Sequence, residues 1–209
     1  MLKVTYQSKI EKQGLLILKN YLIYIFYLTS LFSFFGCNSS SSYTKLVNKE
    51  LKSGKIENNL FLGFQFGMTK DQYFDRCSVL NKEKIIVSGG RNFSPEQILV
   101  PKNQEEKKIK MSFFGTFDNQ RILNGFDIQF NFLGWSDWNI DYQSPVLLDQ
   151  IKDSILTWFP GNDFIQVKID ESVKTAYVKI DGNRRVVMYT MNSKDVVVKI
   201  NNLFNPSSK

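Results

Sequence analysis

The chain has 209 residues, contains no histidine and only two cysteines, and carries a net charge of +7. The missing histidine excludes Ser–His–Asp and Cys–His nucleophilic sites and His-ligated zinc, and two cysteines are too few for a four-cysteine zinc or iron–sulfur site. Residues 1–37 carry +3 of the charge, which leaves +4 for the rest of the chain. This ordinary basic balance gives no reason to expect a nucleic-acid partner.

The N-terminal segment is typical of a secretory signal. Lysines up to Lys19 precede an uncharged apolar stretch at residues 21–35, which ends at Gly36-Cys37 and is followed by a run of serines. A basic start, a short apolar core and a small residue before the cleavage point predict export. The alternative is an uncleaved transmembrane helix over residues 15–36, which would be long enough to cross a bilayer core.

The cysteine indicates which type of signal this is. Phe34-Phe35-Gly36-Cys37 resembles the lipobox of bacterial lipoproteins. The resemblance implies removal of residues 1–36 by cleavage between Gly36 and Cys37, attachment of lipid, including palmitate, to Cys37, and contact with the membrane through that lipid. It also implies a periplasm-facing location at the cell membrane or outer membrane. Residues 37–59 then comprise the lipidated cysteine and a flexible polar linker.

The ordered domain is predicted at residues 60–201, and its first helix carries the clearest local signal. A short strand or extended lead-in is predicted at residues 60–68. Thr69, which follows it, fits a capping box with Gln72, so a helix is predicted over residues 70–81. The apolar face of this helix comprises Tyr73, Phe74, Cys77 and Leu80. Because Cys77 shares this face, we expect it to be a small core residue.

Alternating apolar residues predict the strands. These lie at residues 98–101, 108–117 and 122–133 before a second helix, and at residues 164–169, 175–180, 184–191 and 195–200 after it. The second helix is predicted over residues 145–159, with Ser144 as its N-cap and Pro145 at its first position. Asp181-Gly182 marks a hairpin, and residues 202–209 read as a polar tail.

This order of elements predicts an α+β fold built from antiparallel β-meander sheets, each covered by one helix. A helix followed by strands occurs twice, at residues 60–135 and at residues 145–201, which suggests a tandem duplication. The pattern leaves open whether the two halves share one core.

The start of the first helix carries a second resemblance. Phe66-Gly67-Met68-Thr69-Lys70-Asp71-Gln72-Tyr73 resembles the start of the first helix in small outer-membrane-assembly lipoproteins of the SmpA/OmlA type, and in the wider set of domains with a β-lactamase-inhibitor-like fold. The resemblance implies helices packed on an antiparallel sheet, a lipid anchor in the periplasm, and action by protein binding without an active site.

The loop between the halves holds two candidate groups. Trp135 and Trp138 form either an exposed binding surface or the lid of the core. Asp137 and Asp141 flank Trp138 and could serve as paired carboxylates in acid–base chemistry, although loop aspartates more often satisfy turns.

A further candidate is the basic pair Arg184-Arg185, with Lys174 and Lys179 nearby. These side chains could bind lipid headgroups or form a solvated hairpin rim. No residues have the spacing of a metal site, and no cofactor is predicted.

Together these features predict a lipid-anchored envelope protein that acts as a non-catalytic protein-binding or assembly module on another envelope protein. One alternative is an inhibitor or immunity-type protein that blocks a toxin or hydrolase, which predicts a flat aromatic surface. The other is a carbohydrate-active enzyme using two carboxylates, which requires a concave pocket where they converge.

Overall fold

The computed structural model describes residues 42–89, 94–101, 105–168 and 175–204. The chain divides between Ser40 and Ser41 into two units, and the described residues all belong to the second. The predicted signal peptide and Cys37 lie outside the described residues. Across the described ranges, no helix combines the length and the apolar character that a membrane crossing requires.

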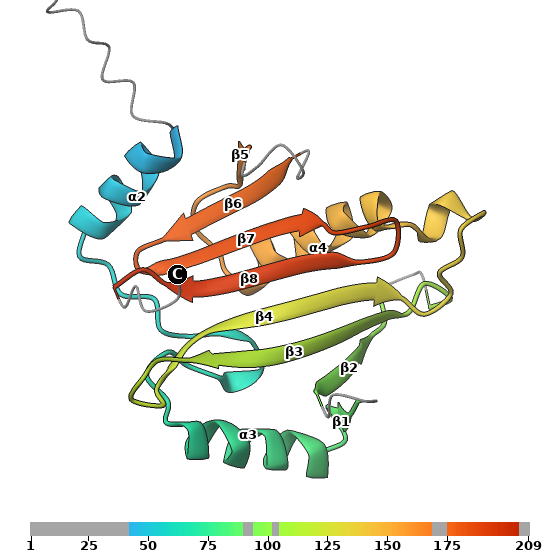
Figure 1. Cartoon of the computed structure of the whole chain (residues 1–209), viewed down its shortest axis with the longest axis horizontal. Coiled ribbons are helices and arrows are strands. Elements are labelled where there is room, and N and C mark those ends of the chain that lie inside the picture. The colour runs from blue at the N-terminus through green and yellow to red at the C-terminus, as the bar shows by residue number, and fades with distance from the viewer. Residues whose placement is uncertain (1–41, 90–93, 102–104, 169–174, 205–209) are drawn as a thin grey trace, which may run out of the picture. The chain divides into compact units, whose positions relative to one another are not determined.

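The described residues form one eight-stranded antiparallel sheet with the strand order β1-β2-β3-β4-β8-β7-β6-β5 (Figure 1). β1 to β4 make one meander and β5 to β8 another, and the last strand of each, β4 and β8, pair with each other. The bounds are β1 Val87–Ser88, β2 Pro95–Leu99, β3 Ile109–Phe117, β4 Leu123–Phe132, β5 Ile165–Val167, β6 Ala176–Asp181, β7 Arg184–Thr190 and β8 Val196–Asn202.

The α+β class is therefore confirmed. Separate sheets, each covered by its own helix, are not confirmed, because the β4–β8 pairing joins the two meanders into one sheet. The predicted hairpin is present, with Asp181 and Arg184 as its closing pair, so that the two-residue turn is Gly182-Asn183. Gly182 has a φ of 55°, a conformation that favours glycine at the first position of such a turn.

One face of the sheet carries the core. Phe113, Ile128, Val198 and Met188 lie opposite one another across β3, β4, β8 and β7, and all four are buried. Side chains alternate along a strand, so the residues two positions away on each strand extend this apolar face. The predicted period-two row on β4 is confirmed, since Phe126, Phe130 and Phe132 are buried beside Ile128.

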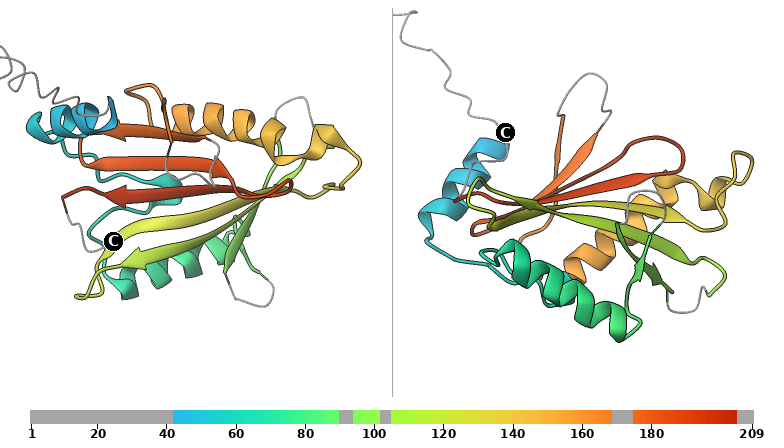
Figure 2. Two further views of the ribbon diagram at one scale, coloured as in Figure 1. Left: turned by 45° about the horizontal axis from the view of Figure 1, so that its top comes forward. Right: turned by 60° about the horizontal axis from the view of Figure 1, so that its bottom comes forward.

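Two helices cover this face and share the core. α3 (Lys70–Lys82) contributes Tyr73 and Leu80 to it, and α4 (Ser144–Trp158) contributes Leu147, Ile151 and Ile155. Figure 2 shows both helices on the same side of the sheet. The two halves therefore share one core.

The helix starts follow the prediction in one case and differ in the other. Thr69 and Gln72 form the predicted capping box of α3, in which each side chain bonds the backbone of the other residue. α4 takes Gln143 as its N-cap, and Ser144 is its first residue. The Ser144 hydroxyl instead donates to the carbonyl of Asn192, which ties the start of α4 to the β7–β8 turn.

The predicted extended lead-in at residues 60–68 is wrong. Phe61–Gly63 forms a single 3-10 turn, η1, and Leu62 within it has a φ of 53°. This turn places two rings in the core, with the Phe61 centroid 5.3 Å from that of Phe113 and the Phe64 centroid 5.1 Å from that of Phe126. The apolar residues that suggested a strand are thus buried by a turn.

The flexible linker predicted at residues 37–59 is also corrected. Residues Ser42–Lys52 form helix α2, which contacts β6. Its Tyr43 hydroxyl accepts a hydrogen bond from Arg185 at 2.8 Å. Arg185 alternates on β7 with the core residues Val186 and Met188, so Tyr43 lies on the sheet face opposite α3 and α4. Contacts of α2 with residues far away in the chain, such as Tyr43 with Arg185, order this segment, and local sequence patterns do not predict them.

The capping box gives a test of the α3 boundary. Replacing Thr69 by Ala removes the acceptor for the Gln72 N–H, and we expect the free energy of unfolding to fall by about 1 kcal/mol. Urea unfolding followed by circular dichroism measures the change. Thr157→Ala, near the end of α4 and exposed, is the matched control and should change stability by no more than a few tenths of a kcal/mol. Equal effects of the two variants would contradict the assigned cap.

Candidate functional site

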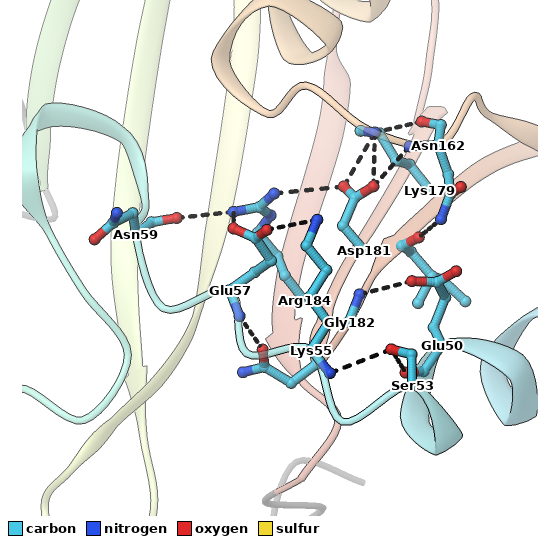
Figure 3. Close-up of polar contacts among 12 residues, drawn as sticks. Glu50, Ser53, Lys55, Glu57, Asn59, Asn162, Lys179, Asp181, Gly182 and Arg184 are labelled. Carbon is cyan, nitrogen blue, oxygen red and sulfur yellow. Dashed lines mark hydrogen bonds and ion pairs between the residues drawn. The ribbon is translucent and has the colours of Figure 1, made fainter.

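A buried ionic cluster lies at the β6–β7 hairpin (Figure 3). Lys179 is 0%, Asp181 2% and Arg184 3% exposed. The Asp181 carboxylate lies 3.0 Å from the Lys179 ammonium and 3.4 Å from the Arg184 guanidinium, so one acid sits between two bases. Lys179 also donates to the carbonyl of Asn162, and the Arg184 guanidinium lies 4.3 Å from the centre of the Phe159 ring.

The segment after α2 completes this cluster. Glu57 lies 3.6 Å from Arg184, and the carbonyl of Asn59 accepts a hydrogen bond from Arg184 at 3.0 Å. Glu50, from α2, accepts from the Gly182 N–H at 2.9 Å. Lys55 pairs with Glu57 at 2.8 Å, and this contact raises the pKa of the Lys55 ammonium. Three acidic and three basic side chains therefore balance in charge where α2, its following segment and the hairpin meet.

The basic residues predicted near the hairpin have a different role from either one expected. Lys179 and Arg184 are buried and paired, so they form neither a headgroup-binding patch nor a solvated rim. Arg185 bonds Tyr43 and Asn201. Lys174 lies outside the described residues. Asp181, which alternation places on the same side of β6 as Lys179, is the sequence signal that could have indicated a buried pair.

A cavity of about 480 Å³ lies on the sheet face opposite the core helices. Val178, Val187 and Tyr189 contribute to its lining on the sheet, and Tyr43 of α2 contributes to its wall. The lining is mostly apolar, with Arg185 and Lys199 as its cationic side chains. α2 thus forms part of the boundary of this cavity through Tyr43.

A second cavity, of about 620 Å³, lies beside α3 and has Phe74, Cys77, Val87 and Phe114 among its lining residues. Cys77 packs against the core, as the prediction requires, but it is only partly buried and also lines this cavity. Burial raises the pKa of the Cys77 thiol, and burial also raises the pKa of the Tyr73 hydroxyl. A thiol of raised pKa carries little thiolate at neutral pH and is a weak nucleophile.

The loop that follows β4 presents the largest exposed aromatic side chain. Trp138 is 87% exposed, so it is not a lid over the core. Trp135 is partly buried, and the Lys194 ammonium lies 5.2 Å from the centre of its ring. Leu133, Ile140 and Met191 are exposed as well. We call Leu133, Trp138, Ile140 and Met191 the Trp138 surface.

Contacts between the loop and the neighbouring turn hold this surface together. The Ser144 N–H donates to the carbonyl of Ser193 at 2.8 Å, and Lys194 covers Trp135. Both contacts join the segment before α4 to the β7–β8 turn, which carries Met191. Figure 1 shows the segment before α4 and the β7–β8 turn at the same end of the sheet.

The candidate carboxylates do not converge on a cavity described above. Asp137 and Asp141 are both exposed, and neither lines the hollow beside Tyr43 or the one beside Cys77. Asp141 instead donates its backbone N–H to the side chain of Asn139 at 3.2 Å, and the Asp137 carbonyl accepts from Gln143 at 2.9 Å. Within the described ranges, no group of three or more Asp, Glu or Cys side chains is placed to hold a metal ion.

No family model matches the sequence, and no curated protein or solved structure is significantly similar to it. The resemblances to bacterial lipoproteins and to SmpA/OmlA-type domains therefore stay predictions.

The ionic cluster predicts a large effect of removing its central acid. Asp181→Ala leaves Lys179 and Arg184 buried beside each other without their shared partner, and we expect a loss of about 3–5 kcal/mol in the free energy of unfolding. Asp127→Ala is the matched control, because Asp127 is half-exposed and lies 3.7 Å from Lys199. Its loss should stay below about 1 kcal/mol. Urea denaturation of both variants distinguishes the two sites, and equal losses would contradict the cluster's central role.

Proposed function

We propose that the chain is a lipid-anchored, non-catalytic module of the bacterial envelope that binds another protein through the Trp138 surface. The observation that carries the proposal is the exposure of Trp138, 87% on a folded domain. An indole this exposed on a folded domain, with three other exposed apolar side chains on the same loop and the neighbouring turn, favours a binding role, because tryptophan is among the residues that contribute most to protein–protein affinity.

The surroundings of Trp138 support a role in recognition. Backbone hydrogen bonds join the end of the loop to the β7–β8 turn, so the segment that carries the indole needs little ordering of its backbone on binding. Charged side chains accompany the apolar ones, as in the polar rim of an interface: Asp137 and Asp141 adjoin Trp138 and Ile140 in the chain and are exposed, and Lys194 lies over Trp135. An inhibitor would use the same surface, and the identity of the captured partner separates the two roles.

The anchor is supported by the signal-like N-terminus and by Cys37 directly after Gly36. Diacylation of one cysteine gives stable attachment, since each buried methylene contributes about 0.8 kcal/mol. Either anchor, lipid or uncleaved helix, would place the domain outside the cytoplasm.

Lipid attachment is tested by growing bacteria that express the chain in medium with labelled palmitate and measuring the label on the purified chain. We expect label on the wild-type chain and none on Cys37→Ser, because the other cysteine, Cys77, follows no signal sequence. Cys77→Ser is the matched control and should take up label like the wild type. Equal labelling of wild type and Cys37→Ser, or no label on either, would overturn lipid attachment at Cys37.

Partner binding is tested by Trp138→Ala. Removing a central exposed indole should weaken binding by about 2 kcal/mol, roughly thirtyfold, while stability is unchanged. The partner is first captured by crosslinking in the native envelope, and its affinity for purified variants is then measured by titration. Phe204→Ala is the control, because Phe204 is also exposed but follows β8, at the opposite end of the sheet. If the Phe204 and Trp138 variants bind as the wild type does, the Trp138 surface is not the interface.

A further inference from the structure

The proposed protein-binding surface leaves the exposed face of α2 without a role. Lys45, Lys49 and Lys52 follow one another at spacings of four and three residues, which places them along one side of the helix, and all three are exposed. The acidic residue of the helix, Glu50, is only 8% exposed, because its carboxylate accepts a hydrogen bond from the Gly182 N–H. The exposed side of α2 is thus cationic, and no exposed acid of α2 lies among the three lysines.

Contacts near both ends fix α2 on the domain. Near its start, the Tyr43 hydroxyl accepts from Arg185 at 2.8 Å, and near its end Glu50 bonds Gly182 at 2.9 Å. Ser53 also donates to the carbonyl of Glu50 directly after the helix. A ligand that binds the three lysines therefore orients the whole domain, because α2 is held on the sheet.

We propose that the Lys45–Lys49–Lys52 face of α2 binds the anionic lipid headgroups of the membrane to which the chain is attached, and that this contact orients the domain. The proposal rests on the proposed attachment at Cys37. Ser42 follows Cys37 by five residues, a stretch that spans at most about 18 Å when fully extended. The first lysine of the face comes within one helical turn of that point.

Charge and distance together select the membrane as the occupant of this face. Each lysine close to an anionic leaflet strengthens binding about fivefold, and this attraction decays within about 8–10 Å at moderate salt. A cationic helix on a long tether would rarely be within that range. The short connection to Cys37 keeps α2 near the headgroups.

The orientation that follows is compatible with the proposed protein-binding role. α2 docks at the β6–β7 hairpin, and the Trp138 surface adjoins the β7–β8 turn, so the two surfaces lie at opposite ends of β7 (Figure 1). With α2 against the lipid, Trp138 lies at the end of the sheet distant from the membrane, where a partner can reach it.

The test measures lysine reactivity in the membrane-extracted full chain. The chain is reconstituted into vesicles of phosphatidylcholine alone and into vesicles that also contain phosphatidylglycerol, and is then treated with a water-soluble acetylating reagent. Mass spectrometry gives the modification rate at each lysine. We expect Lys45, Lys49 and Lys52 to react several-fold more slowly in the anionic vesicles only, and added salt to reverse the protection. Lys82 and Lys84, which are exposed beside the end of α3, should react equally in both.

Two triple variants complete the test. Lys45→Gln/Lys49→Gln/Lys52→Gln should lower the affinity of the chain for anionic over neutral vesicles by about a hundredfold, at fivefold per lysine. Lys82→Gln/Lys84→Gln/Lys108→Gln removes the same charge elsewhere and should leave that preference within a few-fold of the wild type. The headgroup contact alone would be overturned if the α2 lysines were acetylated at equal rates in both kinds of vesicle while the chain was vesicle-bound and carried palmitate on Cys37. A chain without palmitate on Cys37 would overturn the lipid attachment instead.

Discussion

The pairing of β4 with β8 is the constraint on which the rest of the structure depends. It turns two four-stranded meanders into one sheet, and α3 and α4 pack on the same face of that sheet in one core. The seam requires close approach. At Gly125, opposite Asn201, a Cβ atom would lie 2.2 Å from the backbone carbonyl oxygen of Ile200. Each meander alone would leave its last strand as an open edge prone to unwanted pairing. The join converts two such edges into the centre of the domain.

The ionic cluster determines where the segment from α2 to η1 lies, although it contributes little to net stability. Removing several charges from water costs about as much as their mutual attraction returns. Its consequence is positional: Asp181 pairs with Lys179 and Arg184, and Arg184 in turn contacts Glu57 and Asn59. The segment from α2 to η1 can therefore follow one path across the hairpin. A hydrophobic contact would place that segment less specifically, because it lacks directional partners.

The parts that could be predicted are those in which one local rule decides the outcome. Period-two alternation located β3 and β4, and the capping pair Thr69 and Gln72 located the start of α3. α2 was not predicted because its apolar stripe, Leu46, Val47 and Leu51, is short within a polar segment, and its position depends on Arg185 and Gly182, more than 130 residues away. Alternation places Lys179 and Asp181 on one side of β6, but the other partners of the cluster, Glu50 and Glu57, come from distant parts of the chain and could not be predicted. The suggested duplication stays a prediction, as no residue-level correspondence between the halves supports it.

The exposure of Trp138 and the burial of Glu50 belong to one argument about what the surface is for. A domain of this size has enough core to bury a tryptophan, and an indole left in water raises the risk of aggregation unless something covers it. The burial of Glu50 likewise leaves the exposed side of α2 with lysines and without an acid. Neither the exposure of Trp138 nor the burial of Glu50 is favoured by folding alone. The two features lie near opposite ends of β7. In the proposed arrangement one end of the sheet faces the membrane and the other faces the partner, and β7, which lies between β6 and β8, sets the distance between them.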